Sequence, residues 1–435
     1  MAEPTNTPMP PSTPVPATTP RSSSPSVPPV PSLTPNASMT TVPLFPSFPP
    51  GQTSDNTLPK RPIVLHIGDP IKYNPSTYSE FSAQFDVIRP ETAERERSAF
   101  ITALREKRFG DFNAIFRPFW GTGGEMGRWD AELVSLLPKS VKVFASAGAG
   151  FDWADTKLLG ERGIIYCNSG LAAAEAVADF AVAMVISTFR HIPWCIGAAT
   201  LPYLLSDSGG KDDVEGAKRV FQICHAQATA ASHNPRGHVL GFIGFGNIGQ
   251  QIAAKLGYSA FGMRIAYFDV IRKPESVETE LGAVFYDSLE GLLAVSDCAV
   301  LCTPASPDGK PLIRAETLAT MRPGTRFVNI ARGSLVDEEA LADALESGLV
   351  GSVALDVHAE EPRVNARLVK MAGLDGNDGG KPGRVMLTCH NAGGTIETHV
   401  GFEELSMRNI MAVLGGGKAI TPVNLHYFPK KEEGA

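Results

Sequence analysis

Three side chains in the second half of the chain have the chemistry of an active site. Arg332, Glu361 and His390 each lie just beyond a run of apolar residues that is typical of a buried strand. An arginine can bind a carboxylate through two parallel hydrogen bonds, and a histidine exchanges protons near neutral pH. Taken singly, they could be a surface salt bridge or helix cap, a solvated acid and a core histidine. Together they predict a site that binds an anionic substrate and transfers a proton.

A glycine-rich segment precedes these three residues. Gly244-Phe245-Gly246-Asn247-Ile248-Gly249 has the spacing G-x-G-x-x-G, with an apolar run before it and a predicted helix over 247–256 after it. In this context Gly244 permits a tight turn, Gly246 lets a pyrophosphate approach the backbone, and Gly249 allows close packing of helix on strand. The phosphates would then sit at the positive end of the helix. The segment therefore predicts a dinucleotide site rather than a structural turn.

An acid stands at the end of the next predicted strand. Asp269 lies about 20 residues after the glycines, where a carboxylate can accept hydrogen bonds from the ribose hydroxyls of the dinucleotide. Its negative charge would repel a 2′-phosphate. We therefore expect NAD as the cofactor, and nearby Arg272 keeps NADP as the less favoured alternative.

Two series of predicted strands position these residues. Continuous apolar strands that alternate with helices indicate parallel sheets covered on both faces. The fold class expected is α/β, with two Rossmann/flavodoxin-like domains and the active site in the cleft between them. The strands of the first series are predicted at 62–68, 113–116, 141–145 and 163–167, and those of the second at 238–244, 264–269, 283–286, 298–302, 326–330, 352–357 and 385–388.

The domain boundaries follow from composition and strand order. Residues 1–58 hold about half of the 35 prolines among Ser, Thr and small residues, which predicts a disordered extension. Residues 59–200, completed by 395–435, are expected to form a substrate domain, and 201–394 a nucleotide-binding domain. The stretch 372–383, rich in Gly, Asp and Asn, predicts a surface loop between two catalytic segments.

Composition excludes several classes of partner. A net charge of -7 argues against nucleic acid and anionic membranes, and no apolar run approaches the length needed to span a bilayer. Six cysteines without a CxxC pair indicate a reducing compartment, and the cytoplasm is expected. The histidines show no metal-ligand spacing, so no metal is predicted.

The motifs together resemble the D-isomer-specific 2-hydroxyacid dehydrogenase family over about 62–422. Within that family the chain is most similar to the fungal D-mandelate dehydrogenases, through 147–153, 233–241 and 356–358. The resemblance implies a homodimer formed mainly through the nucleotide-binding domain. It also implies that the partner is a small 2-hydroxy or 2-keto acid bound between the domains.

The resemblance also implies a role for each matching residue. Arg332 would clamp the substrate carboxylate and keto oxygen, His390 would be the proton donor or base, and Glu361 would orient and stabilise His390. A Gln in place of Glu361 would instead resemble formate dehydrogenase. By the same resemblance, backbone amides of Ala149 and Gly150 would bind the substrate carboxylate, Asp356 the carboxamide of the cofactor, and Thr303, Pro304 and Ala331 would line the cofactor.

The function expected is an NAD-dependent oxidoreductase acting on CH–OH groups, a D-2-hydroxyacid dehydrogenase or 2-keto acid reductase. An aromatic substrate pair such as mandelate and benzoylformate is the first choice. Phe119, Trp120 and Trp153 could line a pocket for it or belong to the core. A glyoxylate or hydroxypyruvate reductase is the alternative enzyme. An NADH-sensing scaffold that resembles the corepressors of this fold is the alternative of another class, and the acidic net charge and lack of a basic run weigh against it.

Overall fold

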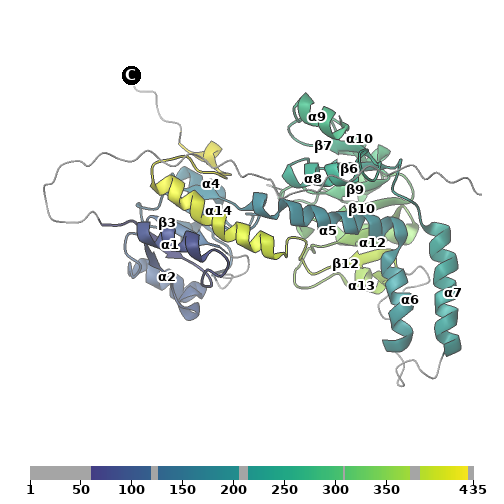
Figure 1. The fold of residues 1–435 in the computed structure, drawn as a ribbon, viewed down its shortest axis with the longest axis horizontal. Coiled ribbons are helices and arrows are strands. Elements are labelled where there is room, and N and C mark those ends of the chain that lie inside the picture. Colours follow the sequence, from purple (N-terminus) through teal and green to yellow (C-terminus); the bar gives the residue numbers. More distant parts are fainter. Residues whose placement is uncertain (1–59, 119–125, 205–213, 307–308, 373–382, 430–435) are drawn as a thin grey trace, which may run out of the picture. The chain divides into compact units, whose positions relative to one another are not determined.

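The computed structural model describes residues 60–118, 126–204, 214–306, 309–372 and 383–429 (Figure 1). The predicted extension 1–58, nearly all of the predicted loop 372–383, and Phe119 and Trp120 lie outside these residues. The described chain belongs to one compact unit, Pro59–Ala435, which contains two parallel sheets. The predicted α/β class with two parallel sheets is confirmed.

The first sheet has five parallel strands in the order β2-β1-β3-β4-β5. Four of them match predicted runs, and β2 was not predicted. All three residues of β2 are only half-buried, and so short a segment gives no continuous apolar signal. The strands are β1 Ile63–His66, β2 Asp86–Ile88, β3 Ala114–Arg117, β4 Val143–Ser146 and β5 Ile165–Cys167.

The second sheet has seven parallel strands in the order β12-β11-β10-β9-β6-β7-β8, and the sequence predicted all seven. The order reverses direction between β6 and β9, where open α/β sheets bind their ligands. The strands are β6 Val239–Ile243, β7 Arg264–Phe268, β8 Ala283–Phe285, β9 Cys298–Leu301, β10 Thr325–Asn329, β11 Val350–Leu355 and β12 Val385–Leu387.

Helices connect the strands of both sheets (Figure 1). Those around the first sheet are α1 Pro75–Gln84, α2 Arg97–Arg105, α3 Ala131–Ser135 and α4 Thr156–Glu161, with α14 Ile396–Leu414 from the end of the chain. The others are α5 Gly170–Arg190, α6 Ile192–Leu204, α7 Val214–Ala231, α8 Asn247–Leu256, α9 Glu275–Leu281, α10 Leu289–Val295, α11 Ala315–Leu318, α12 Glu338–Ser347 and α13 Ala366–Ala372.

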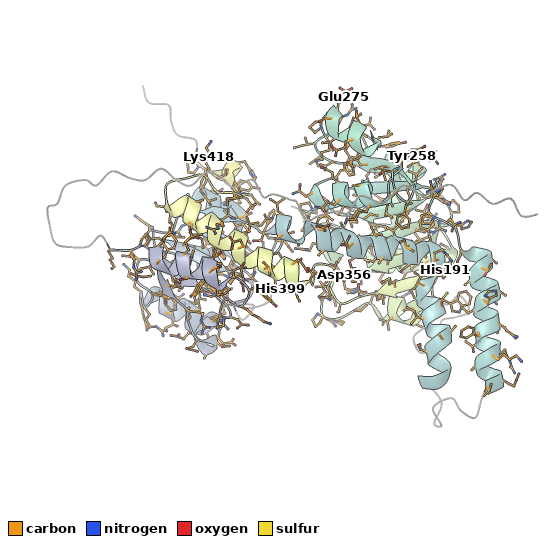
Figure 2. The ribbon with its side chains drawn as sticks, in the orientation of Figure 1. His191, Tyr258, Glu275, Asp356, His399 and Lys418 are labelled. Atoms are coloured by element: carbon orange, nitrogen blue, oxygen red, sulfur yellow. The ribbon has the colours of Figure 1, made fainter. Side chains whose placement is uncertain are left out.

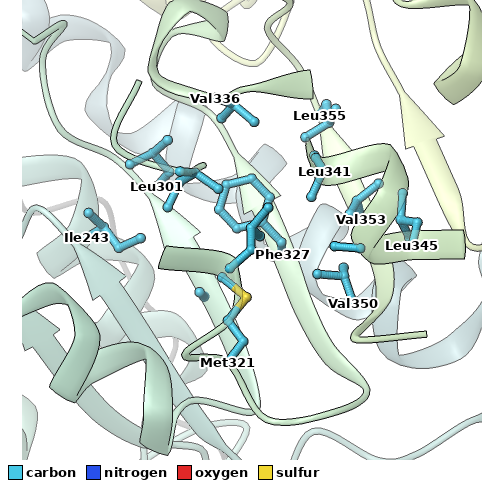
Figure 3. Close-up of a cluster of buried hydrophobic side chains, with 14 of the residues drawn as sticks. Ile243, Leu301, Met321, Phe327, Val336, Leu341, Leu345, Val350, Val353 and Leu355 are labelled. Atoms are coloured by element: carbon cyan, nitrogen blue, oxygen red, sulfur yellow. The ribbon is translucent and has the colours of Figure 1, made fainter. Parts of the chain in front are cut away.

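The core of the seven-stranded sheet fixes the strand that carries Arg332. Phe327 of β10 is fully buried and lies among side chains of β9, β11 and α12, as Figure 3 shows. At the last residue of β10, the Asn329 side chain accepts a hydrogen bond from the Ala331 amide at 2.9 Å and donates one to the Arg332 carbonyl at 3.0 Å. A rigid strand and a side-chain-braced turn therefore present Arg332.

Helix α5 packs on the same sheet. Ala181, Met184, Val185 and Phe189 are buried in a cluster with side chains of β6, β9 and β10. The predicted domain boundary at residue 200 stays a prediction, although this packing places the second half of α5 against the nucleotide-binding sheet. Helices α6 and α7, which follow it, pack on each other and were not predicted (Figure 1).

Helix α14 returns to the first sheet and is held there by a buried acid. The Glu403 carboxylate has no solvent exposure and accepts hydrogen bonds from the successive backbone amides of Lys72, Tyr73 and Asn74 at 2.7–2.9 Å. Charge-assisted bonds of this kind are stronger than neutral ones. The end of the chain thus belongs to the packing of the first sheet.

A buried histidine at the end of β1 makes stability depend on pH. His66 has no solvent exposure, and burial, followed by the nearby charge of Arg89, lowers its pKa to about 3. The unfolded chain takes up a proton near pH 6.5 whereas the folded chain does not, so this contribution to stability is complete above pH 6.5 and is lost as the pH falls toward 3. The free energy of unfolding should differ between pH 7 and pH 5 by about 2 kcal/mol less in His66→Leu than in the unchanged protein. Urea unfolding at both pH values measures this difference. The exposed residue His426, changed to Leu, is the control; an equal response of both variants would contradict the assignment.

Candidate active site

The glycine-rich segment joins β6 to α8 as predicted, and its three glycines occupy different surroundings. Gly244 has a φ of 88°, and a Cβ there would lie 3.0 Å from the backbone of Cys302 and Thr303. A Cβ on Gly249 would lie 3.1 Å from the Gly244 carbonyl, whereas one on Gly246 would meet nothing within 4 Å. Gly246 is also the N-cap of α8. Open space beside a bare backbone at a ten-residue helix N-terminus fits a pyrophosphate.

Asp269 stands immediately after β7 and faces the same loop. One carboxylate oxygen accepts a hydrogen bond from the Phe245 amide at 2.8 Å and pairs with the Lys273 amine at 2.9 Å, and the other accepts one from the Ile271 amide at 3.2 Å. Burial raises the pKa of Asp269, but these contacts outweigh it and hold the pKa below its usual value. The side chain is therefore ionised and tied to the glycine loop, as a ribose-binding acid would be.

Arg272, which kept the NADP alternative open, pairs with Glu278. Its guanidinium forms two hydrogen bonds with the Glu278 carboxylate, at 2.8 and 2.9 Å. The cation beside Asp269 is Lys273, which the sequence analysis did not single out. Both lie in the short loop after β7, and spacing alone does not tell which way each side chain turns.

His390 and Glu361 are brought together although 29 residues separate them. The Nδ1 atom of His390 lies 2.8 Å from Oε2 of Glu361, and both side chains are partly exposed. The other Glu361 oxygen accepts a hydrogen bond from the His358 amide at 2.9 Å. An ionised carboxylate accepts at Nδ1, so the neutral imidazole carries its proton there and Nε2 is the basic nitrogen.

Asp356, which is labelled in Figure 2, directly follows β11 and anchors the loop that carries His390. Its carboxylate is buried and accepts hydrogen bonds from the Thr388 hydroxyl at 2.6 Å and the amides of Asn391 and Ala392 at 3.0 and 2.8 Å. The His390 amide donates to the Asp356 carbonyl at 2.7 Å, and His390 itself has a left-handed φ of 56°. Asp356 thus holds a strained turn in place. Its predicted contact with the cofactor carboxamide stays a prediction.

His358 has a polar role that the sequence analysis missed. We expected it to be a packing residue, and it is indeed 95% buried, but its Nε2 lies 2.8 Å from the Thr388 carbonyl. With its amide on Glu361, it links the two segments that carry Glu361 and His390. The position of His358 between Asp356 and Glu361 in the sequence is the signal that could have indicated this polar role.

Arg332 is partly exposed and contacts the turn that holds Ala149 and Gly150. Its Nε donates to Asp152 at 3.0 Å and its Nη1 to the Ala331 carbonyl at 2.7 Å. A Cβ added to Gly150 would overlap Nη2 of Arg332, so the arginine side chain would have to move to admit a larger residue there. Asp152 was not predicted as a partner, although it follows the small-residue turn directly. Trp153 packs against the core of the first sheet, with the Arg117 guanidinium 4.3 Å from its ring centroid.

Thr303 and Pro304 are the remaining predicted site residues. Thr303 lies beside Gly244, and a role for Pro304 in lining the cofactor stays a prediction. Over the described ranges, no group of three or more His, Cys, Asp or Glu side chains could hold a metal ion.

Comparisons with known proteins show which family this chain is similar to. Residues 212–391 match a family model described as the NAD-binding domain of D-isomer-specific 2-hydroxyacid dehydrogenases. The chain is 32% identical over 327 residues to 4-methyl-2-oxopentanoate reductase A of Aspergillus oryzae, covering 75% of this chain and 88% of that protein. It is 32% identical to a glyoxylate reductase of Thermococcus kodakarensis, over 71% of this chain and 83% of the relative. The holo structure of Rhodotorula graminis D-mandelate dehydrogenase is 38% identical, with a TM-score of 0.73, and the match covers 84% and 98% of the two chains.

Proposed function

Because this chain belongs to the D-isomer-specific 2-hydroxyacid dehydrogenase family, we propose that it reduces 2-keto acids to D-2-hydroxy acids with NADH, and catalyses the reverse oxidation with NAD. The observation that carries the proposal is the 2.8 Å contact between His390 and Glu361, which follow β12 and β11. Arg332 follows β10, the strand beside β11. An imidazole held by an acid can supply a proton, and an arginine can clamp a carboxylate.

Each residue of the site has a separate proposed role in the reduction. Bound NADH supplies the hydride that reduces the carbonyl carbon. Arg332 binds the substrate carboxylate and stabilises the negative charge that develops on the keto oxygen. His390 gives a proton to that oxygen from Nε2, and Glu361 stabilises the imidazolium form that does so. In the oxidation His390 takes the proton back. Backbone amides at Ala149 and Gly150 are the proposed second contact for the carboxylate.

We assign an aromatic 2-keto acid, with benzoylformate as the leading example, as the preferred substrate. Support comes from the 38% identity to a mandelate dehydrogenase and from a second relative named for 4-methyl-2-oxopentanoate. Mandelate and 4-methyl-2-oxopentanoate both carry bulky apolar groups. The relatives named glyoxylate reductase favour glyoxylate or hydroxypyruvate as the alternative.

We further propose a cytoplasmic homodimer whose subunits meet through α6 and α7. Ile196, Phe221 and Ile223 on these helices are 44–60% exposed, which is costly for large apolar side chains unless a second copy covers them. The six cysteines are free thiols, as expected in a reducing compartment. The prediction that no apolar run approaches the length needed to span a bilayer is corrected by α5, which among the described helices is long and apolar enough to do so. Its buried face packs on the seven-stranded sheet.

The test is steady-state oxidation of NADH with benzoylformate, 4-methyl-2-oxopentanoate, glyoxylate and hydroxypyruvate. We expect the highest kcat/KM with benzoylformate. Turnover confined to glyoxylate and hydroxypyruvate would support the alternative enzyme. Tight NADH binding without turnover of any 2-keto acid would overturn the enzyme proposal in favour of an NADH-sensing scaffold.

A further inference from the structure

We propose that Lys273 is a latent phosphate-binding cation at the ribose end of the coenzyme site, and that its pairing with Asp269 makes the site reject the 2′-phosphate of NADPH. The inference rests on the proposed function, because it assumes that a dinucleotide binds along the Gly244–Gly249 loop. It goes further by assigning coenzyme choice to a pair of residues rather than to Asp269 alone.

The pair is compact and largely withdrawn from solvent. The Lys273 amine lies 2.9 Å from Oδ2 of Asp269, and the two side chains are 20% and 14% exposed. The same Oδ2 accepts the Phe245 amide, so the ammonium group is held against the second residue of the glycine loop. A cation at this point stands next to the carboxylate expected to contact the ribose hydroxyls.

The other cation of the loop is held elsewhere. Arg272 pairs with Glu278 through two hydrogen bonds, and the Tyr267 hydroxyl donates to the same carboxylate at 2.6 Å. The arginine and tyrosine contacts lower the pKa of Glu278 to about 2, so the acid stays ionised. The Arg272 guanidinium also lies 5.5 Å from the centre of the Phe285 ring on β8. Glu278 and Phe285 thus hold the Arg272 guanidinium, and Tyr267 in turn holds Glu278.

Asp269 would disfavour NADPH binding in two ways. The Asp269 carboxylate repels a 2′-phosphate, and it also neutralises the Lys273 ammonium beside it, which could attract one. Removing the acidic charge should therefore do more than relieve repulsion, because it also releases the Lys273 ammonium as a partner for the phosphate. The charges are only partly exposed, so their effect is screened less than between surface groups.

The test measures coenzyme binding directly, by fluorescence titration of the full chain with NADH and NADPH. Asp269→Asn keeps the shape of the side chain and an acceptor for the Phe245 amide but removes its charge. We expect it to tighten NADPH binding about 10- to 100-fold and to weaken NADH binding. Adding Lys273→Met should abolish at least tenfold of that gain. Adding Arg272→Met, the matched control that removes the same charge from the same loop, should change NADPH binding less than about threefold.

A second probe isolates the ribose end of the site. Adenosine 2′,5′-bisphosphate carries the 2′-phosphate without the nicotinamide, and AMP lacks it. In the Asp269→Asn variant, the bisphosphate should bind more tightly than AMP, the difference should disappear with Lys273→Met, and it should shrink as salt rises.

Several results would overturn the proposal. A gain in NADPH affinity that survives Lys273→Met, or one that Arg272→Met removes, would assign the phosphate contact to another residue. No gain at all in Asp269→Asn, or in Asp269→Ser if the first variant does not fold, would show that no latent cation exists. If the unchanged protein bound neither dinucleotide, the proposed function itself would fail, which these outcomes do not imply.

Discussion

His390→Asn is expected to lower kcat for 2-keto acid reduction about 10³-fold while leaving the dissociation constant of NADH within about twofold. Asparagine retains a polar side chain of similar reach but cannot carry the proton that His390 holds opposite Glu361. The loss should therefore fall on the chemical step. Steady-state kinetics and a fluorescence titration with NADH measure the two quantities on the same preparation.

Two further variants test the cause of this loss of kcat. Glu361→Gln keeps an acceptor near Nδ1 but removes the charge that stabilises the imidazolium, so kcat should fall about 10²-fold, less than in His390→Asn. His426→Asn changes an exposed histidine remote in sequence from the site and should leave kcat unchanged. A His390→Asn enzyme with near-normal kcat would remove His390 from the mechanism.

Gly333→Ala is expected to reduce the free energy of unfolding by about 3 kcal/mol and kcat/KM by at least about 10²-fold. A Cβ at Gly333 would overlap the carbonyl group of His358 and crowd the Ala359 amide. Backbone atoms cannot rotate away as a side chain would, so the segment that carries Glu361 must shift. Denaturant unfolding and steady-state kinetics measure the two effects.

Gly393→Ala provides a matched control for the stability effect. It lies in the neighbouring loop after His390, but a Cβ there would lie 3.5 Å from Val177 and 3.8 Å from Ala173, which are ordinary contacts. Its free energy of unfolding should change by less than about 1 kcal/mol. Equal destabilisation by both variants would show that the close approach at Gly333 has no special weight.

The sequence predicted the parts of the fold that repeat a local signal. All seven strands of the second sheet were found because buried parallel strands are continuous apolar runs. The Gly244–Gly249 segment was placed correctly between β6 and α8, since its glycines are tied to a strand before and a helix after. The short, half-buried strand β2 offered no such run and was missed.

Contacts between distant segments were harder to predict. The partnership of Asp152 with Arg332 joins residues 180 positions apart, and no local pattern announces it. For Arg272 and Lys273 the difficulty was direction rather than distance, because adjacent side chains in one loop turn to different acids. His358 is buried, as a packing residue would be, but the contact of its ring was not predicted, because it is made with the backbone carbonyl of Thr388, 30 residues away.

Chiral analysis of the product tests whether the protein reduces a 2-keto acid to the D-hydroxy acid. The protein is incubated with benzoylformate and NADH, and the hydroxy acid formed is resolved by chiral chromatography while NADH consumption is followed by absorbance. We expect D-mandelate in a 1:1 ratio to the NADH consumed, and none with the His390→Asn variant over the same time. Formation of the L-hydroxy acid, or NADH binding with no hydroxy acid formed from any 2-keto acid, would contradict it.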